Sequence, residues 1–143
     1  MIFAESAPLF LVHVLLTWFM VGLIWTIQVV HYPLMGEVGP ERFSKYSELH
    51  NQKITWIVGP VMLLEAGTGA LLFFLGESRS YFLLSLGMLA IVWASTAFVQ
   101  MPLHTQLGRG FSSSVHSALV RTNWIRTFAW SLRGVLLGIL LLD

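Results

Sequence analysis

Long runs of apolar side chains alternate with short polar segments along the whole chain. The runs cover residues 9–31, 54–75, 81–101 and 119–142. Each run is long enough to cross roughly 30 Å of hydrocarbon as an α-helix that rises about 1.5 Å per residue. The pattern therefore predicts an all-α fold, a bundle of four transmembrane helices in up-down order that forms a single transmembrane domain over residues 1–143.

Stripes of mainly polar and aromatic side chains follow three of these runs at spacings of three and four residues. They comprise His13, Thr17, Met20, Ile24, Gln28 and His31 in the first run, Trp93, Thr96, Gln100 and His104 in and just after the third, and Asn123, Arg126, Trp130 and Arg133 in the fourth. This spacing places the members of one run on one helix face. Unsatisfied polar groups are costly in hydrocarbon, so we expect these faces to point inward and to line a polar intramembrane cavity.

The composition agrees with a membrane protein and excludes several chemistries. Hydrophobic residues make up 56% of the chain, charged residues only 10%, and the mean hydropathy is +0.75, whereas soluble domains are about 25% charged. The absence of cysteine excludes disulfides, thiolate metal sites and covalent haem attachment. Neither a GxxxxGK[ST] nucleotide loop, a GxSxG motif nor a basic nucleic-acid patch occurs, so we expect neither ATP-driven chemistry nor nucleic-acid binding.

The distribution of Lys and Arg predicts the orientation in the membrane. In and beside the first and third connecting segments lie Arg42, Lys45, Lys53, Arg109 and Arg121, and the second carries Arg79. Because cytoplasmic loops are enriched in these residues, we expect a multi-pass protein of the inner (cytoplasmic) membrane with both termini outside. The polar cavity should then open toward the cytoplasm.

The first connecting segment, GPERFSKYSELHNQK, carries signals of a helix of its own. Pro40 suits the first position of a helix. Phe43, Tyr46 and His50 would share one face of it. The segment therefore predicts a short amphipathic helix that lies on the membrane surface as a lid over the polar interior.

Two halves of the chain, residues 1–75 and 76–143, resemble each other. Pro33 in YPL and Pro102 in MPLH are 69 residues apart, and Trp56 and Trp124 are 68 residues apart. Each proline is expected to end or bend its helix, because its ring clashes with the preceding turn and it has no N–H. The matched offsets predict a tandem repeat of two helical hairpins.

The same offset of 68 residues joins Glu65 to Arg133, two charges that lie deep in the second and fourth runs. Equivalent positions of a parallel repeat face one another across the bundle. A lone charge at mid-membrane costs at least ~2.5–3.5 kcal/mol, and a bidentate ion pair would remove much of that cost. We therefore expect the two side chains to pair, either as internal glue or as part of a functional site.

The histidines predict a second site. His31 and His104 end the first and third runs, and His50 and His116 precede the second and fourth. Neutral imidazoles suit haem or a transition metal, with His31 and His104 as the cofactor ligands and all four histidines as candidate metal ligands. The alternative is that they are structural or lipid-facing imidazoles, because no pair has the spacing of a helical metal motif. Candidate catalytic residues are Glu65, Arg133, Asn123 and Arg126.

Four segments carry a resemblance to known proteins: WTIQVVHYPLM, HNQKITWIVGPVMLLE, VQMPLH and LVRTNWIRTFAWSLRG. With them the chain resembles an uncharacterised family of small bacterial four-helix integral membrane proteins, over nearly its whole length. In size and helix layout it is also similar to the anthrone-oxygenase-like membrane proteins. The first resemblance implies the fold and the membrane location, and the second implies cofactor-independent or metal-assisted oxidation of an aromatic molecule.

Three classes of function follow from these features. The first is a redox or oxygenase-type enzyme, or a binding protein, for a lipid-soluble small molecule whose oxygens Arg133, Asn123 and Arg126 would polarise. The second is a small transporter, and the third is a structural or accessory subunit in which Glu65 and Arg133 are glue. We expect membrane lipids and a hydrophobic small molecule as partners, and the sequence leaves a homo-oligomer open.

Overall fold

The structure is a computed structural model that describes residues 2–142, with side chains from Ser6 onward. All of its regular elements in this range are helices. They are α1 (Ile2–Thr26), α2 (Tyr32–Met35), α3 (Pro40–Phe74), α4 (Ser80–Ser95), α5 (Met101–Gly108) and α6 (Ser113–Leu142), with two π-helical turns, η1 (Ile27–His31) and η2 (Thr96–Gln100). The predicted all-α fold is confirmed.

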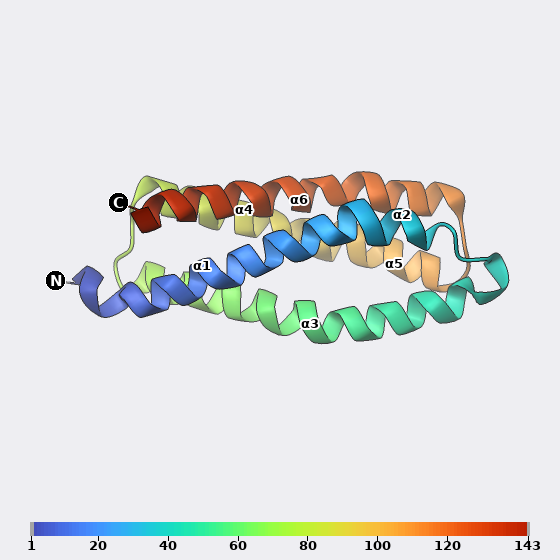
Figure 1. Cartoon of the computed structure of the whole chain (residues 1–143), viewed down its shortest axis with the longest axis horizontal. Coiled ribbons are helices and arrows are strands. Elements are labelled where there is room, and N and C mark those ends of the chain that lie inside the picture. The colour runs from blue at the N-terminus through green and yellow to red at the C-terminus, as the bar shows by residue number, and fades with distance from the viewer. Residues whose placement is uncertain (1, 143) are drawn as a thin grey trace.

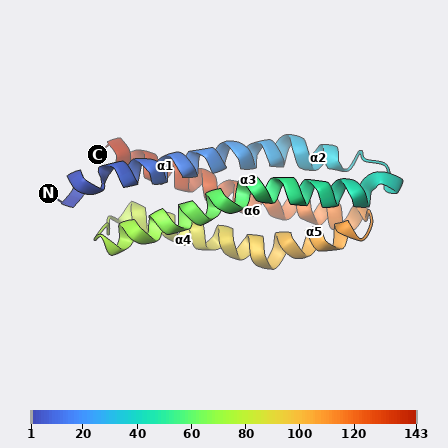
Figure 2. The ribbon, with the colours of Figure 1, turned by 90° about the horizontal axis from the view of Figure 1, so that it is seen from below.

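The elements join into four long rods that run side by side along one axis (Figures 1 and 2). The stretches long and apolar enough to cross a membrane are Ser6–Met35, Pro40–Phe74, Ser80–Gly108 and Ser113–Leu142. The N- and C-terminal ends lie at the same end of the bundle, opposite the connections that follow α2 and α5 (Figure 1). The prediction of four membrane-spanning helices in one bundle is therefore confirmed by length and composition.

The second rod begins earlier than the sequence predicted. α3 starts at Pro40 and continues to Phe74, so the expected surface helix is the first part of the second spanning helix and is not a separate element. Between Glu41 and Ile54 the chain has neither glycine nor proline, and nothing interrupts the helical hydrogen bonds. Phe43 is fully buried within this part, which anchors it to the bundle.

Both prolines that were expected to end or bend a helix lie inside a continuous rod. Pro33 follows η1 and Pro102 follows η2, and the chain stays helical through α2 and α5. Proline has no N–H to give to the carbonyl four residues earlier and clashes with it. A π-helical turn in front of the proline widens the backbone and allows the helix to continue. The two turns start 69 residues apart, at Ile27 and Thr96, while the repeat of two hairpins stays a prediction.

The distribution of polarity is the reverse of that in a soluble domain. Large apolar side chains face outward, such as Trp56 and Phe98, which are each 81% exposed. Inside lie the buried polar and charged residues, namely His13, Thr17, Gln28, Ser47, Glu65, Glu77, Ser85, Ser95, Gln100, Asn123, Arg126, Thr127 and Arg133. This arrangement suits a surrounding lipid, in which polar groups must find partners within the protein.

Candidate functional site

A buried ion pair joins the second and the last rod. The Arg133 Nη2 atom on α6 lies 3.0 Å from the Glu65 Oε1 atom on α3, and both side chains are 0% exposed. The pair that the sequence predicted is therefore formed. It uses only one carboxylate oxygen, in contrast to the expected bidentate contact, because Arg133 Nη1 donates instead to the Ser85 carbonyl at 2.6 Å.

The remaining bonds of this pair reach the other rods. Glu65 Oε1 also accepts from the Thr17 hydroxyl on α1 at 2.7 Å, and Oε2 accepts from the Trp130 indole N–H at 3.1 Å. With the Arg133 bond to the Ser85 carbonyl on α4, the network ties α1, α3, α4 and α6 together. Three donors thus satisfy the carboxylate, which is the condition under which a charge tolerates burial.

His13 on α1 completes this network and has a defined tautomer. Arg133 Nη2 lies 3.2 Å from His13 Nε2, and a guanidinium can only donate, so Nε2 accepts. The ring proton is then on Nδ1, which donates to the Thr68 hydroxyl at 2.8 Å. The Thr68 hydroxyl in turn donates to the Leu64 carbonyl. His13 therefore orients Arg133.

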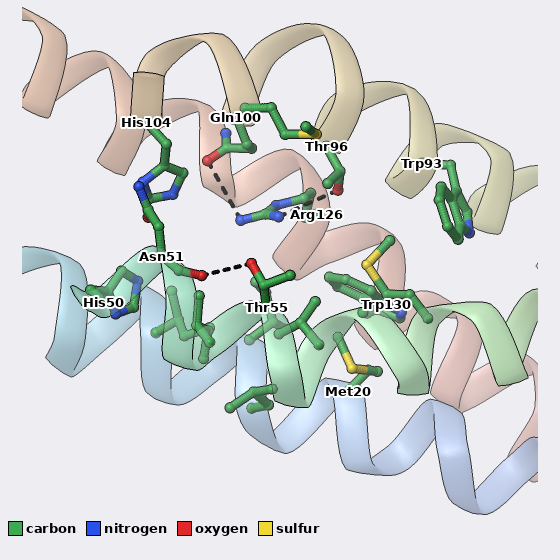
Figure 3. A pocket seen from close by; sticks show the side chains of 18 of the residues that line it. Met20, His50, Asn51, Thr55, Trp93, Thr96, Gln100, His104, Arg126 and Trp130 are labelled. Carbon is green, nitrogen blue, oxygen red and sulfur yellow. Dashed lines mark hydrogen bonds between the residues drawn. The ribbon is translucent and has the colours of Figure 1, made fainter. Parts of the chain in front are cut away.

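A separate cavity of about 560 Å³ lies nearer the connections that follow α2 and α5. Residues from all six α-helices and both π-helical turns line it, and Figure 3 shows His50 and His104 at one end and Trp93 at the other. Neither Glu65 nor Arg133 lines this cavity. A cavity is present, although its lining is mostly apolar, and two of the predicted catalytic residues lie in the buried core outside it.

The cavity has a polar end and an apolar end. Around the polar end lie Thr55, Thr96, Gln100, His104 and Arg126, and around the apolar end lie Met20, Trp93 and Trp130. Two of its lining residues, Leu63 of α3 (65%) and Met101 of α5 (61%), are exposed on the flank of the bundle.

Arg126 is the charged group of this cavity, and Asn123 holds it in place. The Asn123 Oδ1 atom accepts from Arg126 Nε at 2.9 Å and from Nη2 at 2.5 Å. Asn123 Nδ2 donates to Gln28 Oε1 at 2.8 Å, and Gln28 Nε2 donates to the Val120 carbonyl. The structure thus brings together the predicted residues Asn123 and Arg126, and Asn123 positions the guanidinium from behind.

On the cavity side, the contacts of Arg126 are long and neutral. Its Nη1 donates to the Thr96 hydroxyl at 3.3 Å, and its Nη2 lies 3.4 Å from the Tyr32 hydroxyl and 3.5 Å from Gln100 Oε1 (Figure 3). Among the described residues the ion pairs are Glu65–Arg133 and Glu77–Arg79. Within that part of the chain, the buried Arg126 guanidinium therefore has no carboxylate partner.

Tyr32 and His104 form a hydrogen-bonded pair beside Arg126. The Tyr32 hydroxyl lies 2.8 Å from His104 Nε2. The Tyr32 oxygen accepts from Arg126 and has a second lone pair, so either the Tyr32 hydroxyl or a His104 Nε2–H can donate in this pair. His104 Nδ1 is buried and has no partner among the described residues. Tyr32 was not among the residues predicted from the sequence, although it lies four residues after Gln28, the spacing that extends the polar face.

Three of the four histidines lie close together, and His116 is bonded elsewhere, while the metal site stays a prediction. The His31 and His50 rings stack with centroids 4.2 Å apart, and His50 and His104 are 6.1 Å apart. The His116 Nε2 atom is instead bonded to the Tyr32 carbonyl at 2.8 Å. Among residues 2–142, no group of three or more His, Asp or Glu side chains is arranged to hold a metal ion. Ring stacking and the bond to the Tyr32 carbonyl are the contacts that these imidazoles make here.

Comparisons of the chain with known protein families, with curated proteins and with solved structures found no match. The site geometry therefore carries the functional argument.

Proposed function

We propose that this membrane protein binds a lipid-soluble small molecule in the cavity, with an oxygen of the molecule on Arg126. The observation that carries the proposal is a buried guanidinium that lines a cavity of about 560 Å³ and lacks a carboxylate partner among the described residues. A ligand pocket typically combines apolar walls, a volume of roughly 300–1,000 Å³ and a few oriented polar groups. The cavity has all three features.

Two exposed lining residues support a ligand that arrives from the lipid. α3 packs against α1 and α5, and Leu63 and Met101, which line the cavity, are exposed on these two elements, α3 and α5. Met20, Trp93 and Trp130 supply the apolar surface that an aromatic ring or an alkyl chain would cover. A molecule dissolved in the bilayer would reach Arg126 without crossing water.

The location of Glu65 and Arg133 supports a structural role for this pair. Both are fully buried, and Trp130 stands between their network and the cavity, since its indole N–H bonds Glu65 while its ring lines the cavity. The network therefore shapes one wall of the binding site. We assign Arg126 to ligand binding, Asn123 to positioning of Arg126, and Glu65–Arg133 to internal glue.

A second candidate function is an enzyme that exchanges a proton with the bound molecule. Tyr32 and His104 are hydrogen-bonded at 2.8 Å beside Arg126, and His104 lines the cavity. Arg126 would polarise an oxygen of the substrate while this pair gives or takes a proton, which is the arrangement that general acid–base catalysis requires. This second function uses the same binding site and adds proton transfer to or from the bound molecule.

The binding proposal is tested by filling the cavity. Gly59 of α3 lines it, and a Cβ there would meet only Thr55 Cγ2, at 3.9 Å, so Gly59→Leu places an isobutyl group at the wall. Gly67→Leu is the matched control, because Gly67 is on the same helix, has no atom within 4 Å of its Cβ position and does not line the cavity.

Two probes cover acidic and neutral ligands: dodecanoic acid and a decyl-substituted benzoquinone. Each is added to the protein in lipid nanodiscs, and native mass spectrometry measures the fraction of protein that carries one probe molecule. We expect at least one probe to bind the wild-type protein and Gly67→Leu alike, and Gly59→Leu to lose most of that occupancy. If neither probe binds, or if both leucine variants bind as the wild type does, the proposal is wrong.

A further inference from the structure

We propose that the ligand of this cavity is an amphiphile with a single carboxylate and one alkyl chain. The inference rests on the binding function proposed above and specifies the chemistry of the molecule. It follows from the charge, the free donor and the direction of the cavity.

The two buried arginines of α6 have different partners. For Arg133 the chain supplies its own carboxylate, Glu65, at 3.0 Å. For Arg126 the described residues supply amide and hydroxyl oxygens, of Asn123, Gln100, Thr96 and Tyr32. These groups satisfy hydrogen bonds but leave the positive charge uncompensated, and an isolated charge in a low-dielectric interior is costly. An anionic ligand would supply the missing negative charge.

A free hydrogen-bond donor at the polar end suits an anionic oxygen. Each terminal nitrogen of a guanidinium carries two N–H groups. Arg126 Nη1 has one bond, to Thr96 at 3.3 Å, so one of its N–H groups is without an acceptor among the described residues. His104 also lines this end of the cavity, but its unpartnered Nδ1 atom is itself buried. The Arg126 N–H is therefore the donor from which a carboxylate oxygen would accept.

The number of charges favours a carboxylate over a phosphate monoester. One guanidinium balances one negative charge, whereas a phosphate monoester carries about −1.5 to −2 at neutral pH. Among the described residues, Arg126 is the only Lys or Arg that lines the cavity. A phosphate would therefore be left partly uncompensated in the bundle interior.

The direction of the cavity matches that of an amphiphile in a bilayer. Arg126 and His104 lie toward the connections after α2 and α5, and Met20 and Trp93 lie further along the bundle toward its middle (Figure 3). A molecule with its carboxylate on Arg126 would point its chain toward the middle of the membrane, as it does when dissolved in one leaflet. An amphiphile that enters from the side of the bundle would then keep the orientation that it has in the leaflet and would not have to turn over.

The test compares three molecules with the same chain: dodecanoic acid, methyl dodecanoate and dodecyl phosphate. Affinities are measured by native mass spectrometry on the full-length protein in nanodiscs. We expect the acid to bind at least about tenfold more tightly than either of the others, which is the scale of one hydrogen bond to a charged group. Because this comparison uses the wild-type protein, it does not depend on the folding of a variant.

Variants of Arg126 locate the effect. Arg126→Gln should lower the affinity for the acid at least about tenfold and leave the affinity for the ester unchanged. Arg126→Lys keeps the charge and should lower the affinity for the acid less. Arg121→Gln is the control, because Arg121 is exposed on the same helix and does not line the cavity. It should leave the affinity for the acid unchanged.

The outcomes separate this inference from the function on which it rests. If the ester or the phosphate binds as tightly as the acid and Gly59→Leu still abolishes binding, the cavity binds ligands but the carboxylate inference is wrong. Equal loss of acid and ester in Arg126→Gln would also overturn it. If none of the three molecules binds the wild-type protein, and the quinone does not bind either, the binding function fails as well.

Discussion

Arg133 and Arg126 are seven residues apart on α6, and the protein buries each of them in a different way. Arg133 is surrounded by Glu65, Thr17, His13 and the Ser85 carbonyl, and it is fully buried. Arg126 is held from behind by Asn123 and faces a cavity. The first arginine therefore serves the fold, and the second is available to a ligand.

The Glu65–Arg133 pair makes a prediction about stability. Glu65→Gln and Arg133→Gln should each lower the free energy of unfolding by about 3–5 kcal/mol, because each leaves one buried charge unpaired. The double variant should lose clearly less than the sum of the two, because it removes both charges together. Denaturant unfolding of the purified protein in detergent, followed by circular dichroism, measures all three values.

Additive losses would contradict the ion pair. Arg121→Gln serves as the control for the loss of an arginine on α6, since Arg121 is exposed. If the double variant keeps the affinity for dodecanoic acid, the assignment of Glu65–Arg133 to internal glue is supported. If it folds but binds no probe, the pair belongs to the binding site.

A second prediction concerns the contact between His13 and Gly69. A Cβ on Gly69 would lie 3.0 Å from His13 Cε1 and 3.1 Å from Leu86 Cδ2. Gly69→Ala should therefore displace His13 from Arg133 and lower the unfolding free energy by about 1–3 kcal/mol, as overpacking does. Gly67→Ala, with no atom within 4 Å of its Cβ, should be neutral or stabilise by up to about 1 kcal/mol. Equal stabilities of the two alanine variants would contradict this packing.

Glu77 makes a prediction about pH. Burial alone would raise its pKa, but the hydrogen bonds and charge of Arg79 outweigh burial and hold the pKa below its ordinary value of 4.5. A carboxyl whose pKa is lower in the folded state stabilises the fold above its unfolded pKa, and this contribution disappears as the pH falls through the folded pKa. The wild-type protein should therefore lose stability as the pH falls below about 4.5.

Arg79 also donates to the Leu140 carbonyl at 3.3 Å, so the pair fastens the connection after α3 to the end of α6. Glu77→Gln should remove this part of the pH dependence, and Glu48→Gln, at an exposed position of α3, should retain it. Unfolding temperatures measured from pH 3 to pH 7 compare the two variants. An unchanged pH profile in Glu77→Gln would contradict the role of the pair.

Among the elements, the two π-helical turns connect the fold to the site. η2 supplies Thr96 and Gln100, and both face Arg126 in the cavity (Figure 3). A π-helical turn contains one more residue than an α-helical turn, and each residue advances a helix by about 100°. The turn in front of Pro102 therefore decides which side chains of this rod reach Arg126.

Pro102→Ala restores an N–H that an α-helical turn requires, so it should favour α-helix at η2 and rotate Thr96 and Gln100 relative to Arg126. We expect the affinity for dodecanoic acid to fall at least about threefold, a modest loss by the usual conversion of free energy to affinity. Pro60→Ala is the control, since Pro60 lies inside α3 and does not line the cavity. Equal affinities in the two variants would show that the turn does not position the site.

At the scale of the whole molecule, the bundle places its basic connections at one end. The termini lie at the other end (Figure 1), and Arg42, Lys45, Arg109 and Arg121 belong to the ends of α3, α6 and the connection before α6. The bias of Lys and Arg toward cytoplasmic loops predicts that both termini lie outside.

This orientation is tested with a reporter that is fluorescent only in the cytoplasm. Fused to either terminus it should be dark, and inserted within residues 109–112 it should be bright. Immunoblots of the membrane fraction check that the three fusions are made in equal amount. Fluorescence from a terminal fusion would reverse the predicted orientation.

Much of the fold was predictable, because the length and the apolar composition of each segment decide by themselves whether that segment can cross a bilayer. The length of the apolar runs predicts four helices, since every backbone polar group in hydrocarbon must be bonded within its own helix. The matched depths of Glu65 and Arg133 predicted their ion pair for the same reason, because a charge in lipid requires a partner at its own depth. The start of α3 was missed, because its polar first turns resemble a connection when only hydropathy is considered.

The side chains that meet in the site depend on how each helix is oriented about its axis relative to its neighbours. The sequence of a single helix does not determine this orientation. His31, His50, His104 and His116 lie near one end of the bundle, as their positions predicted, but their partners, a stacked ring for His31 and His50 and the Tyr32 carbonyl for His116, were not readable from the sequence. The sequence by itself determined that charges would be buried. Only the tertiary structure decided that Arg133 receives a carboxylate and that Arg126 faces a cavity without one. The reason is that the partners come from neighbouring rods, and the packing of side chains sets how these rods are placed against one another.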